Sequence, residues 1–144
     1  MITIQHFRYF WHKAVWRRSR SGKSYVVTMT IGSLQKRWID QNGKCAITGL
    51  PMMLPDLPMK GGRSCKFSKG SNHCFHASLD RIDPIGGYTD DNIQFVCRAV
   101  NYAKCDGSDD QIKAFIEALR DPSRAPVIHN PYDQQGGLTA AMTE

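Results

Sequence analysis

The segment from Phe75 to Lys104 constrains the fold of this chain most strongly. Polar and apolar residues alternate along 75–82, which puts every second side chain, Asp80 among them, on one face of a strand. A loop dense in turn-forming residues follows, and 93–97 has the composition of a second strand. The spacing of apolar residues in 98–104 predicts a short helix. The segment therefore predicts a strand–loop–strand–helix unit, which is typical of an α+β protein.

Further elements are predicted on both sides of this unit. Apolar residues recur at helical spacing in 3–18, so this stretch predicts an amphipathic helix. The β-branched residues of 25–31 predict a short strand or an extended piece. Ser33 is placed to cap a helix over 34–41. The sequence Ser-Asp-Asp-Gln at 108–111 is a capping box that opens a final helix.

The chain divides by composition into three parts. Residues 1–24 form a basic helix and loop, residues 25–120 carry the predicted strands and later helices, and residues 121–144 have the Pro and Gly content of a flexible tail. Within the central part, residues 55–73 lack periodicity and predict a long loop. With 144 residues, of which 41% are hydrophobic, we expect one folded domain with a modest core.

No membrane-spanning segment or secretory signal is apparent. The sequence has no run of about 18 apolar residues, and charged residues interrupt its first 25 positions. We therefore expect no membrane partner and a cytoplasmic location.

Positive charge is concentrated at the N-terminal end. The net charge is +6, with nine Lys or Arg and one acid in residues 1–44 and ten Lys or Arg and twelve acids in residues 45–144. Such a concentration is typical of a surface that binds a polyanion, because each neutralised phosphate releases condensed counterions. The alternative is a solvated basic helix without a partner. The candidate contact residues are Arg8, Lys13, Arg17, Arg18, Arg20 and Lys23.

Asp80 and Asn101 are candidates to hold one divalent cation. The predicted unit brings an acid at the end of its first strand near an amide on the helix that follows. Hard cations such as Mg²⁺ take oxygen ligands and keep several waters, so one carboxylate and one amide oxygen are a plausible protein contribution. Alternatively, Asp80 pairs with Arg81 or Lys104, and Asn101 caps a turn.

The residues of 77–104 closely resemble the ββα-metal core of the HNH endonucleases, in the variant often met in phage genomes. The segment 34–52, which contains the Cys-Ala-Ile-Thr-Gly-Leu-Pro sequence, is similar to the one that precedes that core. The resemblance extends over roughly 25–119 and implies an α+β fold with a ββα-metal core and flanking N-terminal and C-terminal helices. Gly86 and Gly87 match loop glycines that would need φ values closed to other residues.

The resemblance also implies roles for individual residues. Asp80 would be a metal ligand on the first strand, and Asn101 would complete the metal site from the helix. Asn92 would tie the connecting loop together and position the catalytic group. Lys104 would lie near the scissile phosphate or the DNA backbone.

Arg81 departs from the pattern of the family, whose general-base histidine follows the Asp directly. An arginine stays protonated and cannot accept a proton from water, although it can bind phosphate or stabilise charge that develops on it. His76 is the first candidate for the base, although the four strand residues that separate it from Asp80 span about 13 Å. His73, Asp83 and a water activated by the cation without a dedicated base are the alternatives.

The cysteines pose a separate question about zinc. Five cysteines in a chain without a signal argue against a disulfide framework. Many family members carry two CxxC pairs, and Cys45 and Cys97 are what remains of them here. Two thiolates do not make a tetrahedral site, so we expect buried thiols, with structural Zn²⁺ as the alternative. The spacing of other possible ligands fits no standard site: Cys65, His73, Cys74 and His76.

Together these features predict a DNA endonuclease that uses Mg²⁺ or Mn²⁺ and no small-molecule cofactor. The basic N-terminal residues would contact the backbone of the duplex, which positions a strand without reading its sequence. The first alternative is a DNA-binding accessory protein that keeps the HNH fold and has lost hydrolysis, which the Arg81 substitution favours. A purely structural protein is the second alternative, and the oligomeric state stays open.

Overall fold

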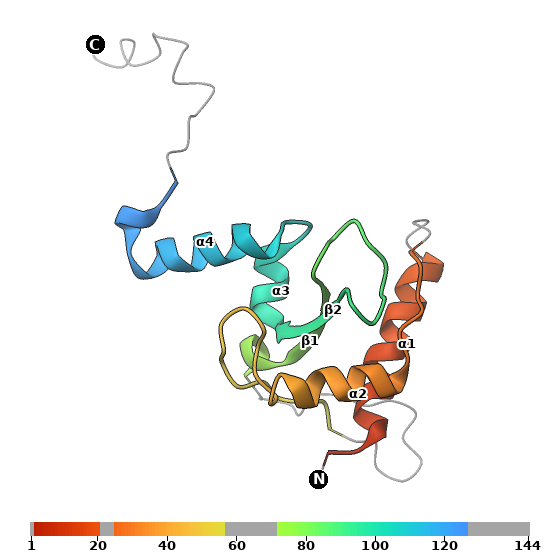
Figure 1. Cartoon of the computed structure of the whole chain (residues 1–144). Coiled ribbons are helices and arrows are strands. Elements are labelled where there is room, and N and C mark those ends of the chain that lie inside the picture. The colour runs from red at the N-terminus through yellow and green to blue at the C-terminus, as the bar shows by residue number, and fades with distance from the viewer. Residues whose placement is uncertain (1, 21–24, 57–71, 127–144) are drawn as a thin grey trace, which may run out of the picture. The chain divides into compact units, whose positions relative to one another are not determined.

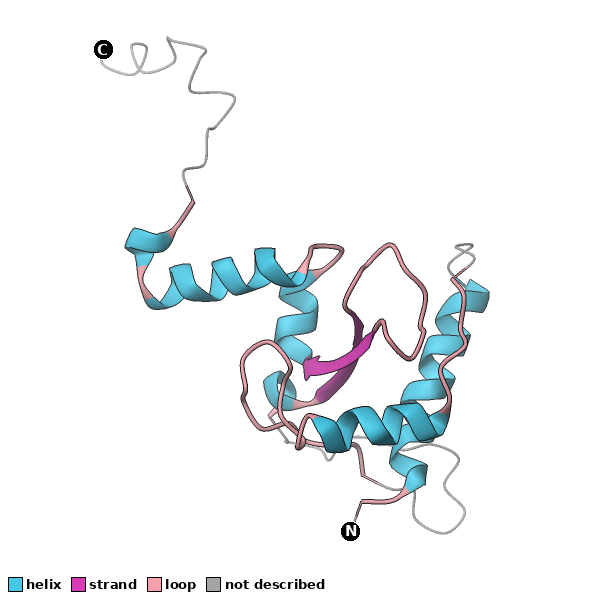
Figure 2. Ribbon diagram, in the orientation of Figure 1, coloured by secondary structure: helices cyan, strands magenta, loops and turns pink. Residues whose placement is uncertain are grey.

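The computed structural model describes residues 2–20, 25–56 and 72–126 (Figures 1 and 2). Most of the predicted long loop and of the predicted tail lies outside the described residues. The helices and strands are α1 (Ile4–Arg20), α2 (Ile31–Asp40), β1 (Ala77–Arg81), β2 (Ile93–Cys97), α3 (Arg98–Lys104) and α4 (Asp109–Arg120), with short 3₁₀ turns at His73–Phe75 and Pro122–Arg124.

The chain forms two compact units, residues 1–113 and 114–144. In the second unit, Arg124 lies 3.6 Å from Glu117 and 3.5 Å from Asp121. In the described part of the chain, no helix is long and apolar enough to cross a membrane. The hydrophobic core and the candidate site lie in the first unit.

The predicted strand–loop–strand–helix unit is present. β1 and β2 are antiparallel, with Ala77 opposite Cys97 and Asp80 opposite Gln94. α3 begins directly after β2. This small sheet among helices confirms the α+β class, and the pairing sends Asp80 and Gln94 to one face of the sheet while Leu79 and Phe95 point to the other.

A cluster of aromatic residues packs α1 and α2 against β2. Phe95 is fully buried, and its ring centroid lies 5.1 Å from that of Phe10, 5.4 Å from that of Trp38 and 6.2 Å from that of Phe7. All three ring contacts are edge-on, an arrangement that aromatic quadrupoles favour. The predicted amphipathic helix therefore uses its aromatic face for the core, which fixes β2 and the hairpin that it forms.

The side chain of Gln41 closes the outer edge of β2. Its Oε1 accepts the backbone N–H of Phe95 at 2.9 Å, and its Nε2 donates to the Phe95 carbonyl at 2.8 Å. One amide thus supplies the bonds that a third strand would otherwise provide, which satisfies buried backbone groups at the sheet edge. The chain then turns through Asn42 and Gly43, both at positive φ.

The structure corrects one local prediction and decides between the alternatives of another. α2 begins at Ile31 with Thr30 as its N-cap, so Ser33 is not the cap. Ser33 instead occupies the third helical position, where it completes a capping box: its backbone N–H donates to Thr30 Oγ1 at 3.0 Å and its Oγ accepts the Thr30 N–H at 2.8 Å. Of the short strand or extended piece predicted for 25–31, the structure has the extended piece: residues 25–30 precede α2, with Val27 in a single parallel bridge to Tyr88.

Gly86 and Gly87 are required for close packing and not for an unusual φ. Neither has a positive φ. A Cβ on Gly87 would lie 2.4 Å from the carbonyl oxygen of Val26, and a Cβ on Gly86 would lie 2.6 Å from Nδ2 of Asn92. The loop between the strands can therefore approach Val26 and Asn92 only because these residues lack side chains.

Candidate active site

Asp80, Arg81 and Asn101 line one open pocket. The pocket has a volume of about 340 Å³ and lies where the end of β1 meets α3. The structure thus brings Arg81 together with the two predicted metal ligands. The other lining residues are Leu79, Tyr88, Tyr102, Cys105 and Asp106.

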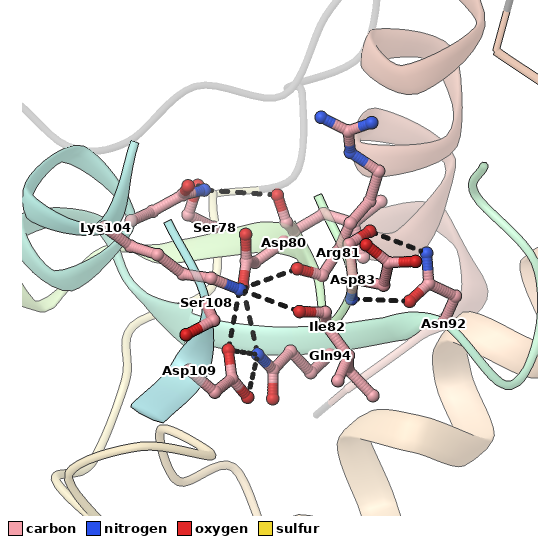
Figure 3. Close-up of polar contacts among 12 residues, drawn as sticks. Ser78, Asp80, Arg81, Ile82, Asp83, Asn92, Gln94, Lys104, Ser108 and Asp109 are labelled. Carbon is pink, nitrogen blue, oxygen red and sulfur yellow. Dashed lines mark hydrogen bonds and ion pairs between the residues drawn. The ribbon is translucent and has the colours of Figure 1, made fainter. Parts of the chain in front are cut away.

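A buried lysine supports Asp80 from behind this pocket (Figure 3). Nζ of Lys104 lies 2.8 Å from Oδ2 of Asp80 and 2.6 Å from Oδ1 of Asp109, and it donates to the Arg81 carbonyl at 2.7 Å. Nε2 of Gln94 bridges the two carboxylates, with 3.0 Å to each. The pairing of Asp80 with Lys104, expected only as an alternative, is therefore present.

The environment keeps Lys104 charged. Its side chain is fully buried, and burial alone lowers the pKa of Lys104, but the hydrogen bonds to Asp109 and Asp80 outweigh it and raise the pKa above its ordinary value. A buried ammonium between two carboxylates and a carbonyl is satisfied in charge and in hydrogen bonds. Lys104 therefore fixes the Asp80 carboxylate, and its ammonium faces protein groups in this structure.

Asn101 is oriented by the strand that it faces. Its Nδ2 donates to Oγ of Ser78 at 2.7 Å and to the Leu79 carbonyl at 3.2 Å. Because the amide nitrogen makes these bonds, the amide oxygen is the atom that Asn101 can offer to a ligand. The residue holds α3 against β1 and does not cap a turn with its side chain.

The donor set fits a hard divalent cation. Both bonds from Lys104 and Gln94 end on Oδ2 of Asp80, so Oδ1 is the atom to offer to a cation, beside the amide oxygen of Asn101. In the described ranges, no three His, Cys, Asp or Glu side chains come together as a metal site. Carboxylate and amide oxygens with several retained waters suit Mg²⁺ or Mn²⁺ and do not suit a structural Zn²⁺.

Arg81 lies against two tyrosine rings. Its guanidinium carbon lies 4.3 Å from the ring centroid of Tyr25 and 5.4 Å from that of Tyr88, and Nη1 donates to the Gly86 carbonyl at 3.0 Å. The guanidinium points away from the Lys104 ammonium (Figure 3). Cation–π contacts with partial desolvation restrict the guanidinium, which prepares it to bind an anion.

Asn92 ties the connecting loop together. Its Oδ1 accepts the Asp83 N–H at 2.7 Å, and its Nδ2 donates to the carbonyls of Asp83 at 3.0 Å and of Gly87 at 2.8 Å. These bonds span the loop from its first residues to its glycine pair. Asn92 therefore fixes the backbone that follows Arg81, and it does not itself line the pocket.

The candidate general bases are not brought to the pocket. His76 is fully buried one position before β1, 4.7 Å between ring centroids from His73, and burial and then the neighbouring His73 and Arg98 lower its pKa. Asp83 accepts the Ile85 N–H at 2.9 Å in a local turn. Within the described part of the chain, the pocket is lined by none of the candidates His76, His73 and Asp83.

Cys45 and Cys97 are buried and adjacent. Both are free thiols that share a hydrogen bond, and burial together with the neighbouring Cys45 raises the pKa of Cys97 to about 12. Cys97 therefore stays protonated at neutral pH. Cys65 lies outside the described residues.

The predicted DNA-contact residues are only partly described. Arg8 and Lys13 are exposed on α1. The side chains of Arg17, Arg18 and Arg20 and the whole of Lys23 lie outside what the structure describes.

Gln94, Asp109 and Tyr25 are site residues that sequence reasoning missed. Gln94 could have been found from the strand register, which sets it opposite Asp80. Asp109 was visible only as a residue in the first turn of a capped helix, and Tyr25 only as part of an extended segment. No local pattern indicated that either would reach the ββα unit.

Comparisons with known proteins agree with this geometry. No protein-family model and no curated protein sequence matches the chain. Among solved structures, the chain is similar to the rare-cutting HNH restriction endonuclease PacI, with a TM-score of 0.53. The two chains share 16% identity over 81% of this chain and 78% of PacI. The protein therefore has the HNH endonuclease fold, which confirms the predicted ββα core; the role of Arg81 stays a prediction.

Proposed function

We propose that the protein is a divalent-metal-dependent DNA endonuclease of the HNH type. The observation that carries the proposal is the open pocket at the end of β1, where Asp80, Arg81 and Asn101 meet. Two observations support DNA as the substrate: the structural similarity to PacI, a restriction endonuclease, and the positive charge of the N-terminal residues.

Asp80 and Asn101 would hold the cation through Oδ1 and the amide oxygen. When bound, Mg²⁺ or Mn²⁺ supplies Lewis-acid polarisation of the scissile phosphate and neutralises the leaving oxygen. Lys104 and Gln94 keep the Asp80 carboxylate in place through their bonds to Oδ2. Preorganised ligands of this kind avoid the cost of rearrangement during the reaction.

Arg81 would bind a non-bridging oxygen of the scissile phosphate. Its stacked guanidinium is oriented before substrate arrives, and it carries positive charge at every working pH. It would therefore stabilise the negative charge that the non-bridging oxygens carry in the transition state as water attacks. It cannot serve as the base.

The positions of the histidines bear on which group activates water. His76, the first candidate, is buried away from the pocket, and neither His73 nor Asp83 lines it. This arrangement supports the remaining candidate, a water activated by the bound cation without a dedicated protein base.

A DNA-binding accessory protein without hydrolysis is the second candidate function. The ion pair between Lys104 and Asp80, at 2.8 Å, favours it, because a cation must share the carboxylate with an ammonium. Arg81 in place of a histidine favours it as well.

Plasmid nicking separates the two functions. We expect the native protein to nick supercoiled DNA with Mg²⁺ or Mn²⁺ and not with EDTA, and we expect Asp80→Asn and Asn101→Ala to lose most of this activity. Asp80→Asn retains an acceptor for Lys104, so it should remain folded, and Asp90→Ala, an exposed change outside the pocket, serves as the matched control. No nicking by the native protein, or equal nicking by all variants, would eliminate the endonuclease in favour of the accessory protein.

A further inference from the structure

We propose that the groove between α1 and α3, beside the catalytic pocket, binds backbone phosphates of the DNA strand that flank the scissile one. This flanking groove is lined by Tyr9, Lys13, Ser78, Arg98 and Tyr102, with the apolar residues Phe10, Ala14, Ala77 and Leu79 and with Tyr88 beneath them. The inference rests on the proposed function and names the residues that would place the substrate strand.

The flanking groove and the catalytic pocket are neighbours that share three lining residues. Leu79, Tyr88 and Tyr102 line both. Ser78, in the groove, accepts the Asn101 amide at 2.7 Å, and Asn101 lines the pocket. A strand with its scissile phosphate in the pocket would therefore enter the groove with a neighbouring phosphate.

Arg98 is oriented for an anion in the groove. Its Nε and Nη2 lie 2.8 Å and 2.6 Å from Oη of Tyr102, and its guanidinium carbon lies 5.2 Å from the Tyr102 ring centroid. The remaining guanidinium N–H groups can bind phosphate without first losing much side-chain freedom. The planar fork of Arg98 thus has the geometry that phosphate oxygens match.

Lys13 supplies a second cation from the opposite wall. Its Nζ lies 4.8 Å from the Tyr9 ring centroid, on the face of α1 that borders the groove. Lys13 is exposed, so its ammonium can reach a bound strand. The two walls therefore present one charge each, and each charge rests against a tyrosine.

These cations lack acidic partners within the described ranges. The ion pairs of those residues involve Lys36, Lys104, Lys113 and Arg124, and none involves Lys13, Arg81 or Arg98. No acid lines the flanking groove, while Asp80 and Asp106 line the pocket. The two neighbouring hollows thus present three cations to a phosphate backbone: Arg81 in the pocket, and Arg98 and Lys13 on the two walls of the groove.

DNA binding without cleavage tests the proposal. Fluorescence anisotropy of a labelled duplex of mixed sequence, in EDTA at several salt concentrations, gives the affinity and its salt slope. We expect Lys13→Ala and Arg98→Ala each to weaken binding several-fold and to reduce the slope by about one. Lys44→Gln removes the same charge from an exposed residue that lines neither hollow, and should leave affinity within about twofold of native.

Tyr102→Phe provides a variant that preserves both charge and ring. Loss of the hydroxyl releases the Arg98 guanidinium, so we expect weaker DNA binding with an unchanged salt slope, in a protein that melts like the native one. The proposal is overturned if Lys13→Ala and Arg98→Ala bind and nick like the native protein, or if Lys44→Gln weakens binding as much as they do.

The binding assay also separates this inference from the proposed function. If the native protein fails to nick but its DNA affinity depends on Lys13 and Arg98, the groove is supported and the endonuclease is not. If the native protein nicks DNA and both variants nick and bind equally well, the endonuclease stands and the groove does not.

Discussion

Lys104 pairs with two carboxylates, one from the resembling segment and one from outside it. As the last residue of α3 it occupies a position that the HNH resemblance assigned to the neighbourhood of the substrate. The structure instead surrounds its ammonium with Asp80, Asp109 and the Arg81 carbonyl. The resemblance singled out Lys104 as a residue of the site. It could not reveal the contact with Asp109, because Asp109 belongs to α4, which lies beyond the resembling segment 77–104.

Replacement of Lys104 by Met should destabilise the protein strongly. The substitution preserves much of the side-chain volume but leaves the carboxylates of Asp80 and Asp109 near each other without a cation. We expect the free energy of unfolding to fall by roughly 3–5 kcal/mol, measured by urea denaturation. Addition of Asp109→Asn should restore part of the loss. A fall below about 1 kcal/mol would mean that the pair behaves like an exposed ion pair.

His76 should make stability depend on pH in the acidic range. Burial, and then His73 and Arg98, lower its folded-state pKa below the ordinary value of 6.5. The neutral form is therefore favoured by folding, and its contribution is fully present above pH 6.5 and is lost as the pH falls through the folded-state pKa. Urea denaturation across this window should show decreasing stability, and His76→Gln should show a smaller decrease. If stability fell equally with pH in the native protein and in His76→Gln, His76 would not be the cause of the pH dependence. His12→Gln, a change at an exposed histidine, is the control.

At the scale of elements, the hairpin and α3 were predictable because their signals are local. Alternation predicted β1, strand-like composition predicted β2, and helical spacing predicted α3. The edge of β2 was not predictable, since Gln41 reaches Phe95 across 54 positions of sequence. The tight packing of the glycine loop also escaped prediction, because it depends on where residue 26 lies in space.

Gly87→Ala should disrupt the loop between β1 and β2. Its Cβ would lie 2.4 Å from the Val26 carbonyl oxygen, which is backbone and cannot rotate away. We expect a loss of about 1–3 kcal/mol in thermal or urea denaturation. Gly32→Ala is the matched control, because its Cβ would meet only Thr30 Oγ1 at 3.6 Å, and in α2 it should stabilise by up to about 1 kcal/mol. Equal effects of the two substitutions would argue against the close approach.

At the scale of the whole molecule, α1 joins the hydrophobic core to the basic surface. Phe7 and Phe10 are buried in the core, while Arg8 and Lys13 on the same helix are exposed. Composition alone divided the chain after residue 24, but α1 and the hairpin share one core. The basic segment is therefore not a separable arm in the first unit.

Deletion of α1 and neutralisation of its charge should have different consequences. A chain without residues 4–20 loses Phe7, Phe10 and Ala14 from the core, so we expect no cooperative thermal unfolding. Arg8→Gln should melt like the native protein and should bind DNA with a smaller salt slope if α1 contacts the duplex. Circular dichroism and anisotropy measure the two effects. A cooperative transition in the shortened chain would show that α1 is an appendage.

The two-residue period of β1 links the chemistry of the protein to its folding. Leu79 faces the aromatic cluster and Asp80 faces α3. A shift of the strand pairing by one position would therefore turn Asp80 toward the hydrophobic core and Leu79 toward the candidate metal site. A hairpin in the wrong register would lose the core contacts and the pocket residues together. The native register therefore assembles the hydrophobic core and the pocket in one step, and native protein that unfolds cooperatively is expected to carry the assembled pocket.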